Sequence, residues 1–555
     1  MIKNNLFPAY PLARKLLIYK VEMRISILTL LIMFMPAVTI AESIPKQEKP
    51  YGGTLVWGTR NKPSIINPLF TTSSVSVSLQ DLIFNRLVRL NSKAEIEPDL
   101  AESWDISSDG LVYTFHLRKG VRFHDGIECT AYDVKFTYDK IMDPVINSPF
   151  MVYFDLIIAT KVMDKYTFRI ILKKPSTSFI YRLVREIVPE HLLEKVDLKT
   201  CYFNFHPVGT GPFKFKDWSG DNQITLEYNP TYFEGRPYLD KIMVKVYPDS
   251  RSLWTGLMRG EVDYATFIER EDYEVIKNDL AFKAYAFPWD NYYAILYNTA
   301  DPLLVDKRIR EAVAYGIDIK SLIEKIAYGY GVECSGPFYP QCLGFNQQVL
   351  PYEYNPKKSQ ALLKEAGWKD EDNDGILEKD GEELELKVLV DLKSEIYQRI
   401  IMAIRQQLQE VGIKIKVVLY RDERELDKVF LNKYNPQARL RLFLAGADPD
   451  QTKEDWCSAE PKIADKLWIY TNKEVDGLFA QGETTRDKEE RNKIYQKIHQ
   501  IIYDEQPACF LYFPFVFHAV SAKLKNVDEF FTLNMPHYTM KDWYIGEESF
   551  LTERR

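Results

Sequence analysis

The chain has 555 residues, of which 46% are hydrophobic and 27% are charged. This composition is that of a folded protein with room for about three or four domains, and it excludes a mainly disordered chain. The net charge is −7, from 72 basic and 79 acidic residues, and no long basic run occurs. A nucleic-acid-binding protein is therefore disfavoured, because neutralising phosphates requires clustered Lys and Arg.

The N-terminus carries the longest apolar run of the chain, from Ile25 to Met35. Arg24 precedes the run, Pro36 ends it, and small residues then lead to Ala41. The run is shorter than the ~20 residues that a membrane-spanning helix requires. It predicts a secretory signal over residues 1–41 that is cleaved after Ala41, with a buried apolar helix as the alternative. No Cys follows the run, so a lipid anchor is not expected.

The first half of the chain is predicted to consist mainly of short strands. Asp109-Gly110 is typical of a hairpin turn, because both residues tolerate the positive φ that such a turn needs. Tyr113, Phe115 and Leu117 then share one face of the second strand. The strands are expected at 53–58, 103–106 and 111–117, twice within 155–172, and at 224–228 and 241–247.

The second half alternates helices with strands. We expect helices from Asp306 to Gly316, from an Asn355 cap to a Gly367 stop, and from a Ser394 cap to a Gly412 stop. The residues expected to face inward are Ile309, Ala312, Val313 and Gly316 in the first helix and Ala361, Leu362 and Ala366 in the second. In the third helix they are Ile396, Ile400, Ile404, Leu408 and Val411. A half-buried strand is expected to follow, with Ile413, Ile415, Val417 and Leu419 inward. This order predicts the α/β fold class.

The six cysteines are compatible with disulfides, because an exported chain meets an oxidising compartment. Cys334 and Cys342 bracket a Pro-containing loop and are the candidate pair, the alternative being two unpaired buried thiols. The others are Cys129, Cys201, Cys457 and Cys509. No C-x-x-C occurs, so zinc and thioredoxin-type chemistry lack support.

The sequence shows no motif for catalysis. It lacks H-E-x-x-H, the phosphate-binding P-loop, G-x-S-x-G and the dinucleotide fingerprint, and its seven His are not spaced as helical metal ligands. We therefore expect no catalytic residues, although scattered catalytic groups leave an exported hydrolase as an alternative.

One acidic loop has the spacing of a calcium-binding loop. Asp370, Asp372 and Asp374 precede Gly375, and Glu378 is compatible with the ninth position. The twelfth position is Gly381 instead of a bidentate Glu, and Glu382 comes one place late. A polar turn is the favoured interpretation, and no metal site is predicted.

Long stretches of the chain resemble family 5 extracellular solute-binding proteins, the periplasmic dipeptide, oligopeptide and nickel binders of ABC importers. The strongest stretch is AESWDISSDGLVYTFHLRKGVRFHDG at 101–126, followed by ECTAYDVKFTYDKI. Further matches occur in order at 187–196, 207–218, 232–242, 256–265, 306–318, 354–368 and 470–479. Together they cover nearly all of residues 51–545.

The resemblance implies a two-lobed type II clamp with an extra subdomain inserted in the first lobe. Hinges are expected near Phe287–Tyr292 and Glu505–Tyr512. The implied division is lobe I at 42–75, 204–287 and 509–555, the inserted subdomain at 76–203, and lobe III at 288–508.

The resemblance also implies ligand-binding residues. In peptide-binding relatives an Asp after a short Gly-containing turn binds the peptide ammonium, and the matching stretch here is Phe443 to Asp450. Asp448 is the candidate anchor and Asp450 its competitor, while the alternative is that both only shape the turn at Pro449. Further candidates are Ala445 and Gly446 for main-chain contacts, Ser73 and Ser74 on a cleft-lining strand, the hinge residue Tyr512, and Trp289, for which core packing is the alternative.

The function implied is capture of a solute, with a peptide favoured, and its delivery to an inner-membrane ABC permease with its ATPase. A soluble periplasmic monomer without a cofactor is expected. The alternatives are a nickel or other metal chelate, a sugar or an opine-like solute, and a binder whose transport role has been lost.

Overall fold

The computed structural model describes residues 50–220, 222–422, 426, 435–446, 448–458, 470–532 and 535–546. The signal sequence predicted for residues 1–41 lies outside this part of the chain. Among the described residues, no helix combines the length and the apolarity needed to cross a membrane.

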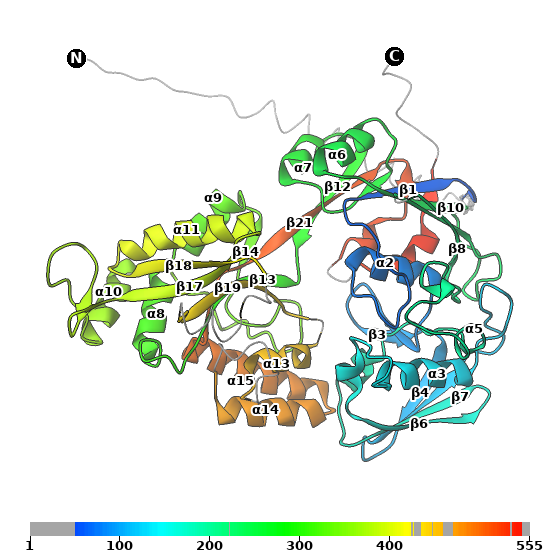
Figure 1. Cartoon of the computed structure of the whole chain (residues 1–555), viewed down its shortest axis with the longest axis horizontal. Helices are drawn as coiled ribbons and strands as arrows, with labels where there is room; N and C mark the ends of the chain where they lie inside the picture. The colour runs from blue at the N-terminus through cyan, green and yellow to red at the C-terminus, as the bar shows by residue number, and fades with distance from the viewer. Residues whose placement is uncertain are drawn as a thin grey trace, which may run out of the picture. The chain divides into compact units, whose positions relative to one another are not determined.

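An eight-stranded sheet joins segments from the start, the middle and the end of the described chain (Figure 1). Its order is β12, β21, β11, β1, β10, β9, β8, and β14 also pairs with β21. β1 is parallel to β10 and β11, whereas the other pairs are antiparallel. The strands are β1 (Thr54–Thr59), β8 (Phe213–Ser219), β9 (Gln223–Tyr228), β10 (Lys241–Val246), β11 (Tyr264–Ala265), β12 (Phe282–Pro288), β14 (Gly331–Glu333) and β21 (Tyr512–Ser521). The strands expected at 53–58, 224–228 and 241–247 are confirmed.

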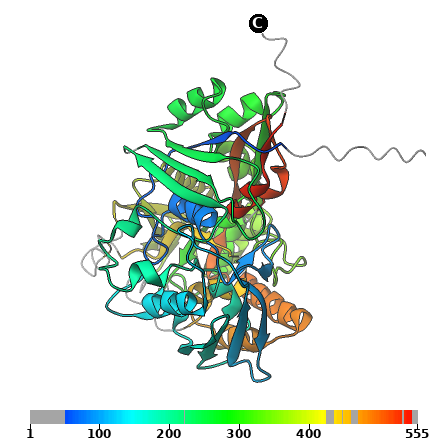
Figure 2. The same ribbon diagram turned by 90° about the vertical axis from the view of Figure 1, so that its right-hand side faces the viewer.

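Helices cover both sides of this sheet. Figures 1 and 2 show α6 (Ser250–Met258) and α7 (Arg270–Ile276) on one side and α2 (Ser74–Ile83) on the other. Buried apolar side chains of β1 and β10, such as Leu55 and Val244, pack in the core that α2 shares.

A four-stranded antiparallel sheet forms in the segment between α2 and β8. Its order is β4 (Ala101–Ile106), β5 (Val112–Leu117), β7 (Thr167–Leu172) and β6 (Ile157–Asp164). The predicted hairpin is confirmed, with Gly110 at a φ of 75°. Tyr113, Phe115 and Leu117 are buried on one face, as expected from their alternation. Helix α3 (Ala131–Met142) begins at a capping box formed by Thr130 and Asp133 and packs against β6 and β7.

A five-stranded sheet forms in the second half of the chain. Its order is β18 (Lys414–Tyr420), β17 (Glu385–Asp391), β19 (Ala438–Leu444), β13 (Asn291–Tyr297) and β20 (Ala508–Phe510). The helices around it are α8 (Lys307–Gly316), α9 (Ile319–Ile326), α10 (Pro356–Glu365) and α11 (Glu395–Gln409). The predicted caps are confirmed: Asn355 accepts a hydrogen bond from the Lys358 N–H, and Ser394 accepts one from the Tyr397 N–H.

Two side-chain predictions in this region are wrong. In α10, Ala361 is exposed, whereas Ser359 and Leu363 are buried against the neighbouring helix α8. In β18 the alternation fails after Ile415, because Val418 is buried and Leu419 is 45% exposed. Val418 packs with Leu389 and Tyr420 in a small cluster of its own, so burial in this strand does not follow one face.

The remaining elements are shorter or lie near the C-terminal end. Helices α14 (Lys473–Thr484) and α15 (Lys488–Glu505) pack against each other. The others are α4 (Phe179–Arg182), α5 (Glu190–Leu193), α13 (Lys453–Trp456), η1 (Met151–Phe154), η2 (Tyr202–Asn204), η4 (Pro449–Thr452), η5 (Asp528–Phe530), η6 (His537–Asp542), and the strand pairs β2–β3 (Val88–Leu90, Ile96–Pro98), β15–β16 (Glu378–Lys379, Glu382–Glu383) and β22–β23 (Leu524–Lys525, Tyr544–Ile545).

The chain crosses between the two large sheets at two adjacent places. β12 belongs to the eight-stranded sheet and β13 to the five-stranded sheet, so the first crossing is at 289–290. β20 and β21 make the reverse crossing at Leu511. The Trp289 N–H donates to the Pro514 carbonyl at 2.8 Å, and the Leu511 N–H donates to the Tyr293 carbonyl at 2.9 Å. The two crossings therefore run side by side.

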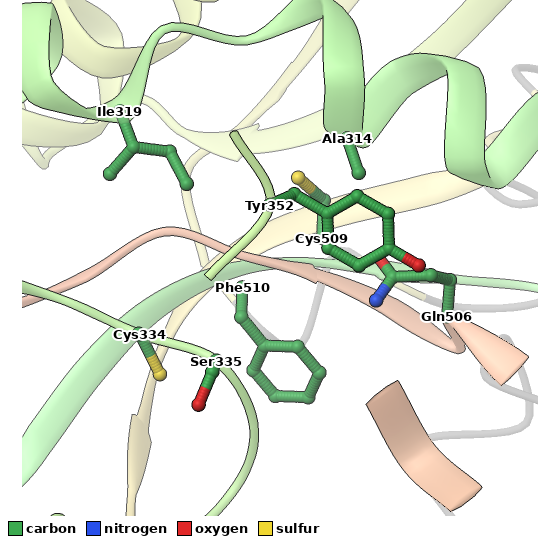
Figure 3. Close-up of a pocket in the computed structure, with 8 residues that line it drawn as sticks. All are labelled: Ala314, Ile319, Cys334, Ser335, Tyr352, Gln506, Cys509 and Phe510. Atoms are coloured by element: carbon green, nitrogen blue, oxygen red, sulfur yellow. The ribbon is translucent and has the colours of Figure 1, made fainter. Parts of the chain in front are cut away.

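The disulfide expected between Cys334 and Cys342 is not formed, and all six cysteines are free. The Cys334 thiol donates to the Gly336 carbonyl at 3.0 Å, whereas the Cys342 thiol donates to the Gly446 carbonyl at 3.2 Å. Figure 3 shows Cys334 beside a small cavity that Cys509 also lines. The cavity volume is about 10 Å³, which is room for one water molecule at most. The spacing in sequence failed here because the loop directs the two thiols to different neighbours.

Candidate functional site

The predicted ligand-binding turn follows β19 directly and lies against the first crossing. The Ala445 N–H donates to the Asp290 carbonyl at 2.8 Å, which fixes the turn to the crossing strand. Gly446 has a φ of 72°, and a Cβ there would clash with the Gln451 side chain. The left-handed φ favours glycine at this position, whereas the Gln451 side chain could move away from a Cβ.

Asp448 is buried, and its carboxylate is already engaged by the protein. Both its oxygens accept hydrogen bonds from Arg491 of α15, each at 2.7 Å. This is a bidentate pair, the strongest geometry for a guanidinium and a carboxylate. Although burial opposes the charge, hydrogen bonding to Asp448 raises the pKa of Arg491 above its ordinary value. Asp448 also accepts the Asp450 N–H at 3.0 Å and so caps η4.

Asp450 belongs to the same buried cluster. Its carboxylate accepts a hydrogen bond from Arg491 at 3.2 Å and another from the Tyr495 hydroxyl. Burial raises the pKa of Asp450, and the neighbouring charge of Asp448 raises it further. One guanidinium thus serves two carboxylates, with Tyr495 supplying a neutral donor.

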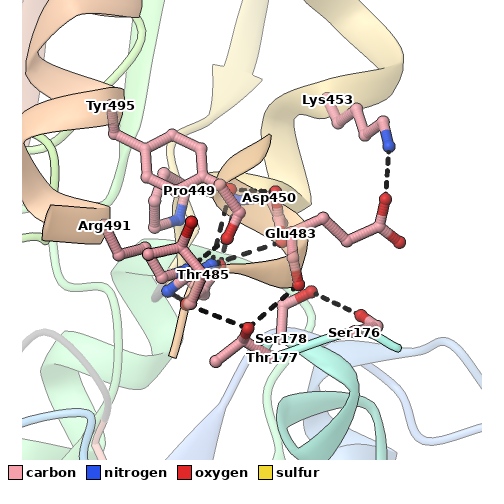
Figure 4. Close-up of polar contacts among 12 residues, drawn as sticks. Ser176, Thr177, Ser178, Pro449, Asp450, Lys453, Glu483, Thr485, Arg491 and Tyr495 are labelled. Carbon is pink, nitrogen blue, oxygen red and sulfur yellow. Dashed lines mark hydrogen bonds and ion pairs between the residues drawn. The ribbon is translucent and has the colours of Figure 1, made fainter. Parts of the chain in front are cut away.

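A second group of contacts joins this cluster to residues 174–178, from the segment predicted to be the inserted subdomain (Figure 4). The Thr177 N–H donates to the Glu483 carbonyl at 2.6 Å, and its hydroxyl contacts the carbonyls of Glu483 and Thr485 at 3.0 Å. Ser178 hydrogen-bonds the Asp450 carboxylate.

The buried Glu483 carboxylate lies at the centre of these contacts. It pairs with Lys174 at 2.9 Å and with Lys453 at 2.8 Å. We call Lys174, Thr177, Ser178, Lys453 and Glu483 the clasp. It ties together two segments that are far apart in the chain, since Lys174 and Glu483 are separated by 309 positions.

The other predicted site residues lie in different surroundings. Ser73 and Ser74 do not lie on a strand as expected: Ser73 is the N-cap of α2 and Ser74 its first residue. The Tyr512 side chain is buried and contacts Tyr293. Trp289 is half-buried at the first crossing, with its ring 6.2 Å from that of Phe267. The structure thus brings Trp289 and Tyr512 to the crossings.

Two residues of this region were missed by the sequence analysis. Arg491 precedes Ile494, Tyr495 and Ile498 at helical spacing, so its place on the inward face of α15 was visible in the pattern. Asp290 stands between two apolar strands and is half-buried at the first crossing. Neither residue belongs to a motif.

The acidic loop at 370–378 is exposed and does form a cluster. Single oxygens of Asp370, Asp372, Asp374 and Glu378 all lie within 4.8 Å of one another. Asp370 accepts backbone N–H groups of Asn373 and Gly375 at 2.8 and 3.2 Å. Gly381 lies in the turn between β15 and β16 with a φ of 81°. The arrangement is that of a hydrogen-bonded polar turn.

Comparisons with known proteins agree with this fold. The family described as bacterial extracellular solute-binding proteins, family 5 middle, matches residues 95–458. The oligopeptide-binding protein AppA of Bacillus subtilis is 29% identical over 539 residues, covering 95% of this chain and 98% of AppA. Heme-binding protein A of Haemophilus influenzae is 28% identical over 488 residues, covering 82% of this chain and 86% of that protein.

Solved structures match over most of their length. The structure of AppA in complex with a nonapeptide aligns with a TM-score of 0.73 and 28% identity, covering 90% of this chain and all of AppA's (100%). NikZ of Campylobacter jejuni in complex with Ni(L-His) aligns with a TM-score of 0.72 and 28% identity, covering 88% of this chain and 99% of NikZ. Since the family match spans more than half of the sequence, this chain belongs to family 5 of the bacterial extracellular solute-binding proteins, which bind solutes for ABC importers and are not enzymes.

Proposed function

We propose that this protein captures peptides in the periplasm and delivers them to an inner-membrane ABC permease with its ATPase. The observation that carries the proposal is the pair of adjacent crossings between two sheets, next to the 443–450 turn to which the resemblance assigns ligand binding. Similarity to AppA along nearly the whole chain supports the same ligand class. The exported location rests on the signal sequence predicted for residues 1–41.

The mechanism we propose is closure around the ligand. A ligand that contacts the elements on both sides of the crossings binds the closed state better than the open one and so shifts the population towards closure. The peptide main chain would pair with the Ala445 carbonyl and the Gly446 N–H, because the Ala445 N–H donates to the Asp290 carbonyl and the Gly446 carbonyl accepts the Cys342 thiol. Main-chain pairing gives affinity independent of the peptide's side chains. Trp289, Tyr512, Ser73 and Ser74 are the further residues proposed to border it.

The contacts of the clasp would hold the protein in its closed state. Its hydrogen bonds join the 174–178 segment to α14, so they form only when these segments meet. The Glu483 side chain is only 5% exposed, and separating the segments would take Lys174 away from it while the pair with Lys453 remains. The clasp therefore adds to the stability of the closed state that a bound peptide favours.

Capture of a metal chelate is the second candidate function. It is supported by the structure of NikZ in complex with Ni(L-His), a protein that is 28% identical to this chain. A chelate small enough to fit in the closed protein would bind beside the same two crossings.

Native mass spectrometry of protein purified without denaturation tests both candidates. A peptide captured from the cell should appear as a set of added masses that fragment into amino-acid ladders and disappear after denaturation. A single added mass with the nickel isotope pattern would favour the chelate instead. Wild-type protein that retains no peptide and binds none from a synthetic pool would contradict the proposal.

A further inference from the structure

The acids around the predicted turn already have partners, which leaves the site without a free negative charge at Asp448. Arg491 holds both oxygens of Asp448 and one of Asp450, and Tyr495 and Ser178 complete the shell of Asp450. A ligand ammonium could bind at Asp448 only by displacing a buried bidentate guanidinium. Such a pair is costly to break, because removing one partner leaves a buried charge.

Asp290 is different from these acids, although it lies next to them. Its backbone carbonyl accepts the Ala445 N–H, and it directly precedes β13 (Asn291–Tyr297). The negative charge of Asp290 acts on Tyr339 and on Cys342, so its carboxylate lies near the cluster in which Tyr339 packs with Tyr292 and Phe443. Cys342 packs against the same cluster, and its thiol contacts the turn at Gly446.

Among the described residues, the Asp290 carboxylate has no basic partner, and the one hydrogen bond it accepts comes from its own backbone N–H. Burial raises the pKa of the Tyr339 phenol and of the Cys342 thiol, and the negative charge of Asp290 raises both further. Cys342 also lies near Asp448. Buried acids elsewhere have charged or polar partners: Asp99 with Asn85, Asp133 with Thr130, Glu186 with Arg86, and Asp263 with Lys523. Asp290 is thus a half-buried acid at the first crossing, and no basic side chain of the described residues neutralises it.

We propose, on the basis of the peptide-binding function above, that Asp290 rather than Asp448 binds the positively charged group of the ligand, and that this group is a primary ammonium. An ammonium carries three donors on one small charge and needs an anion together with neutral acceptors. Asp290 supplies the anion, and the Tyr339 hydroxyl and the carbonyls of the 445–446 turn are neutral acceptors beside it.

The neighbouring groups favour an ammonium over a soft metal ion. A metal would need the Cys342 thiolate, but burial raises the pKa of this thiol to about 12, and the nearby Asp290 raises it as well. The thiol therefore keeps its proton and donates to the Gly446 carbonyl. Burial also raises the pKa of Asp290 to about 6, so its charge, and with it the binding of a cation, is lost as the pH falls from 7.5 to 5.

The experiment measures binding of a defined pool of synthetic peptides of two to nine residues to wild-type protein and to Asp290→Asn, by calorimetry at pH 7.5 and pH 5. One set of peptides has a free N-terminus and a second set has an acetylated N-terminus. A third set contains an internal Lys, either free or acetylated. Asp105→Asn, an exposed acid on β4, is the matched control. Melting temperatures establish that the variants are folded.

We expect wild-type protein to prefer the ammonium-bearing form at pH 7.5 by ~30-fold or more, the effect of losing one partner of a buried charge pair. The preference should shrink at pH 5 and vanish in Asp290→Asn at both pH values. Loss with the acetylated N-terminus identifies the α-ammonium as the ligand group, and loss with acetyl-Lys identifies a side chain.

A preference that Asp290→Asn retains would overturn the role of Asp290 and leave peptide binding standing. Failure of the wild-type protein to bind any peptide would overturn both proposals. If Asp290→Asn does not fold, the wild-type comparison decides instead: a preference that is the same at pH 7.5 and pH 5 contradicts an anchor that titrates near pH 6.

Discussion

Two acid-rich regions of this protein have opposite surroundings. The cluster of Asp448 and Asp450 is buried, and Arg491 and Tyr495 fill its hydrogen-bonding capacity. The loop of Asp370, Asp372 and Asp374 is exposed, and its carboxylates accept backbone N–H groups and face water. Burial makes a charge costly unless it is paired, whereas water stabilises an exposed charge without a partner. Aspartate therefore belongs to a buried, paired network in one place and to an exposed turn in the other.

The largest effect is expected from removing the cation that pairs with both acids of the buried cluster. Arg491→Met should lower the free energy of unfolding by about 3–5 kcal/mol, because Asp448 loses its bidentate partner and Asp450 loses its hydrogen-bonded cation. Urea unfolding of the ligand-free protein measures it. Arg308→Met is the matched control, since Arg308 pairs with Asp306 at the surface and should cost less than about 1 kcal/mol. Equal losses in the two variants would contradict the comparison.

The comparison extends to a buried polar side chain, His518. Within the part of the chain that the structure describes, neither ring nitrogen of His518 has a hydrogen-bond partner, and the ring stacks against Phe287 with 5.6 Å between the ring centroids. Burial lowers the pKa of His518 to about 3, with His537 adding to the effect. The unfolded chain then binds a proton near pH 6.5 that the folded protein excludes.

Stability should therefore fall as the pH is lowered, by ~2 kcal/mol between pH 7 and pH 5 for this residue. His518→Phe should remove that share of the acid sensitivity and keep the stacking. His499, which is buried, and His124, which is half-buried, have pKa values lowered to about 4 and remain in both proteins, so the difference between variant and wild type isolates His518. Parallel stability curves between pH 7 and pH 5 would refute the assignment.

The clasp is intermediate between the buried Asp448–Asp450 cluster and the exposed loop, because Glu483 is buried while Lys174 is half exposed. Glu483→Gln should destabilise the protein by about 1 kcal/mol and should also weaken the contact between residues 174–178 and α14. Urea unfolding and the radius of gyration from X-ray scattering of ligand-free protein are the measurements. Glu274→Gln, which removes a surface pair with Lys277, serves as the control. An unchanged radius of gyration would mean that the clasp does not hold the closed state.

The smallest effect is expected in the exposed loop. Asp372→Asn should change the free energy of unfolding by no more than about 0.5 kcal/mol, because surface substitutions away from special features are nearly neutral. Thermal unfolding in a buffer with a chelator measures it. A loss of several kcal/mol would show that this loop is a structural network after all.

Local features of the sequence predicted the secondary structure well. The hairpin at Asp109-Gly110 and the caps at Asn355 and Ser394 depend on neighbouring residues, and all three are present as expected. The inward face of α8 is also correct, with Ile309, Ala312, Val313 and Gly316 buried. The failures at Ala361 and Leu419 arose where a neighbouring element, absent from a local pattern, decides which side of the helix or strand is covered.

The candidate site was predictable only in part. Resemblance led to the 443–450 turn and to Asp448, but not to Arg491, which lies 43 residues further along the chain. Nor could spacing show that Cys342 contacts Gly446, 104 residues away, instead of forming a disulfide with Cys334. Contacts at such separations depend on how helices and sheets dock.

The sequence by itself determined the α/β class and most of the strands, helices and caps, because these depend on composition, periodicity and residues a few positions apart. Its membership of family 5 was visible through the resemblance of long stretches to that family. The tertiary structure alone decided which charges are paired: Asp448 with Arg491, Glu483 with two lysines, and Asp290 with no basic group among the described residues. The physical reason is that the cost of a charge depends on its burial and on the groups that folding brings within hydrogen-bonding distance, and neither is a property of the residue's place in the chain.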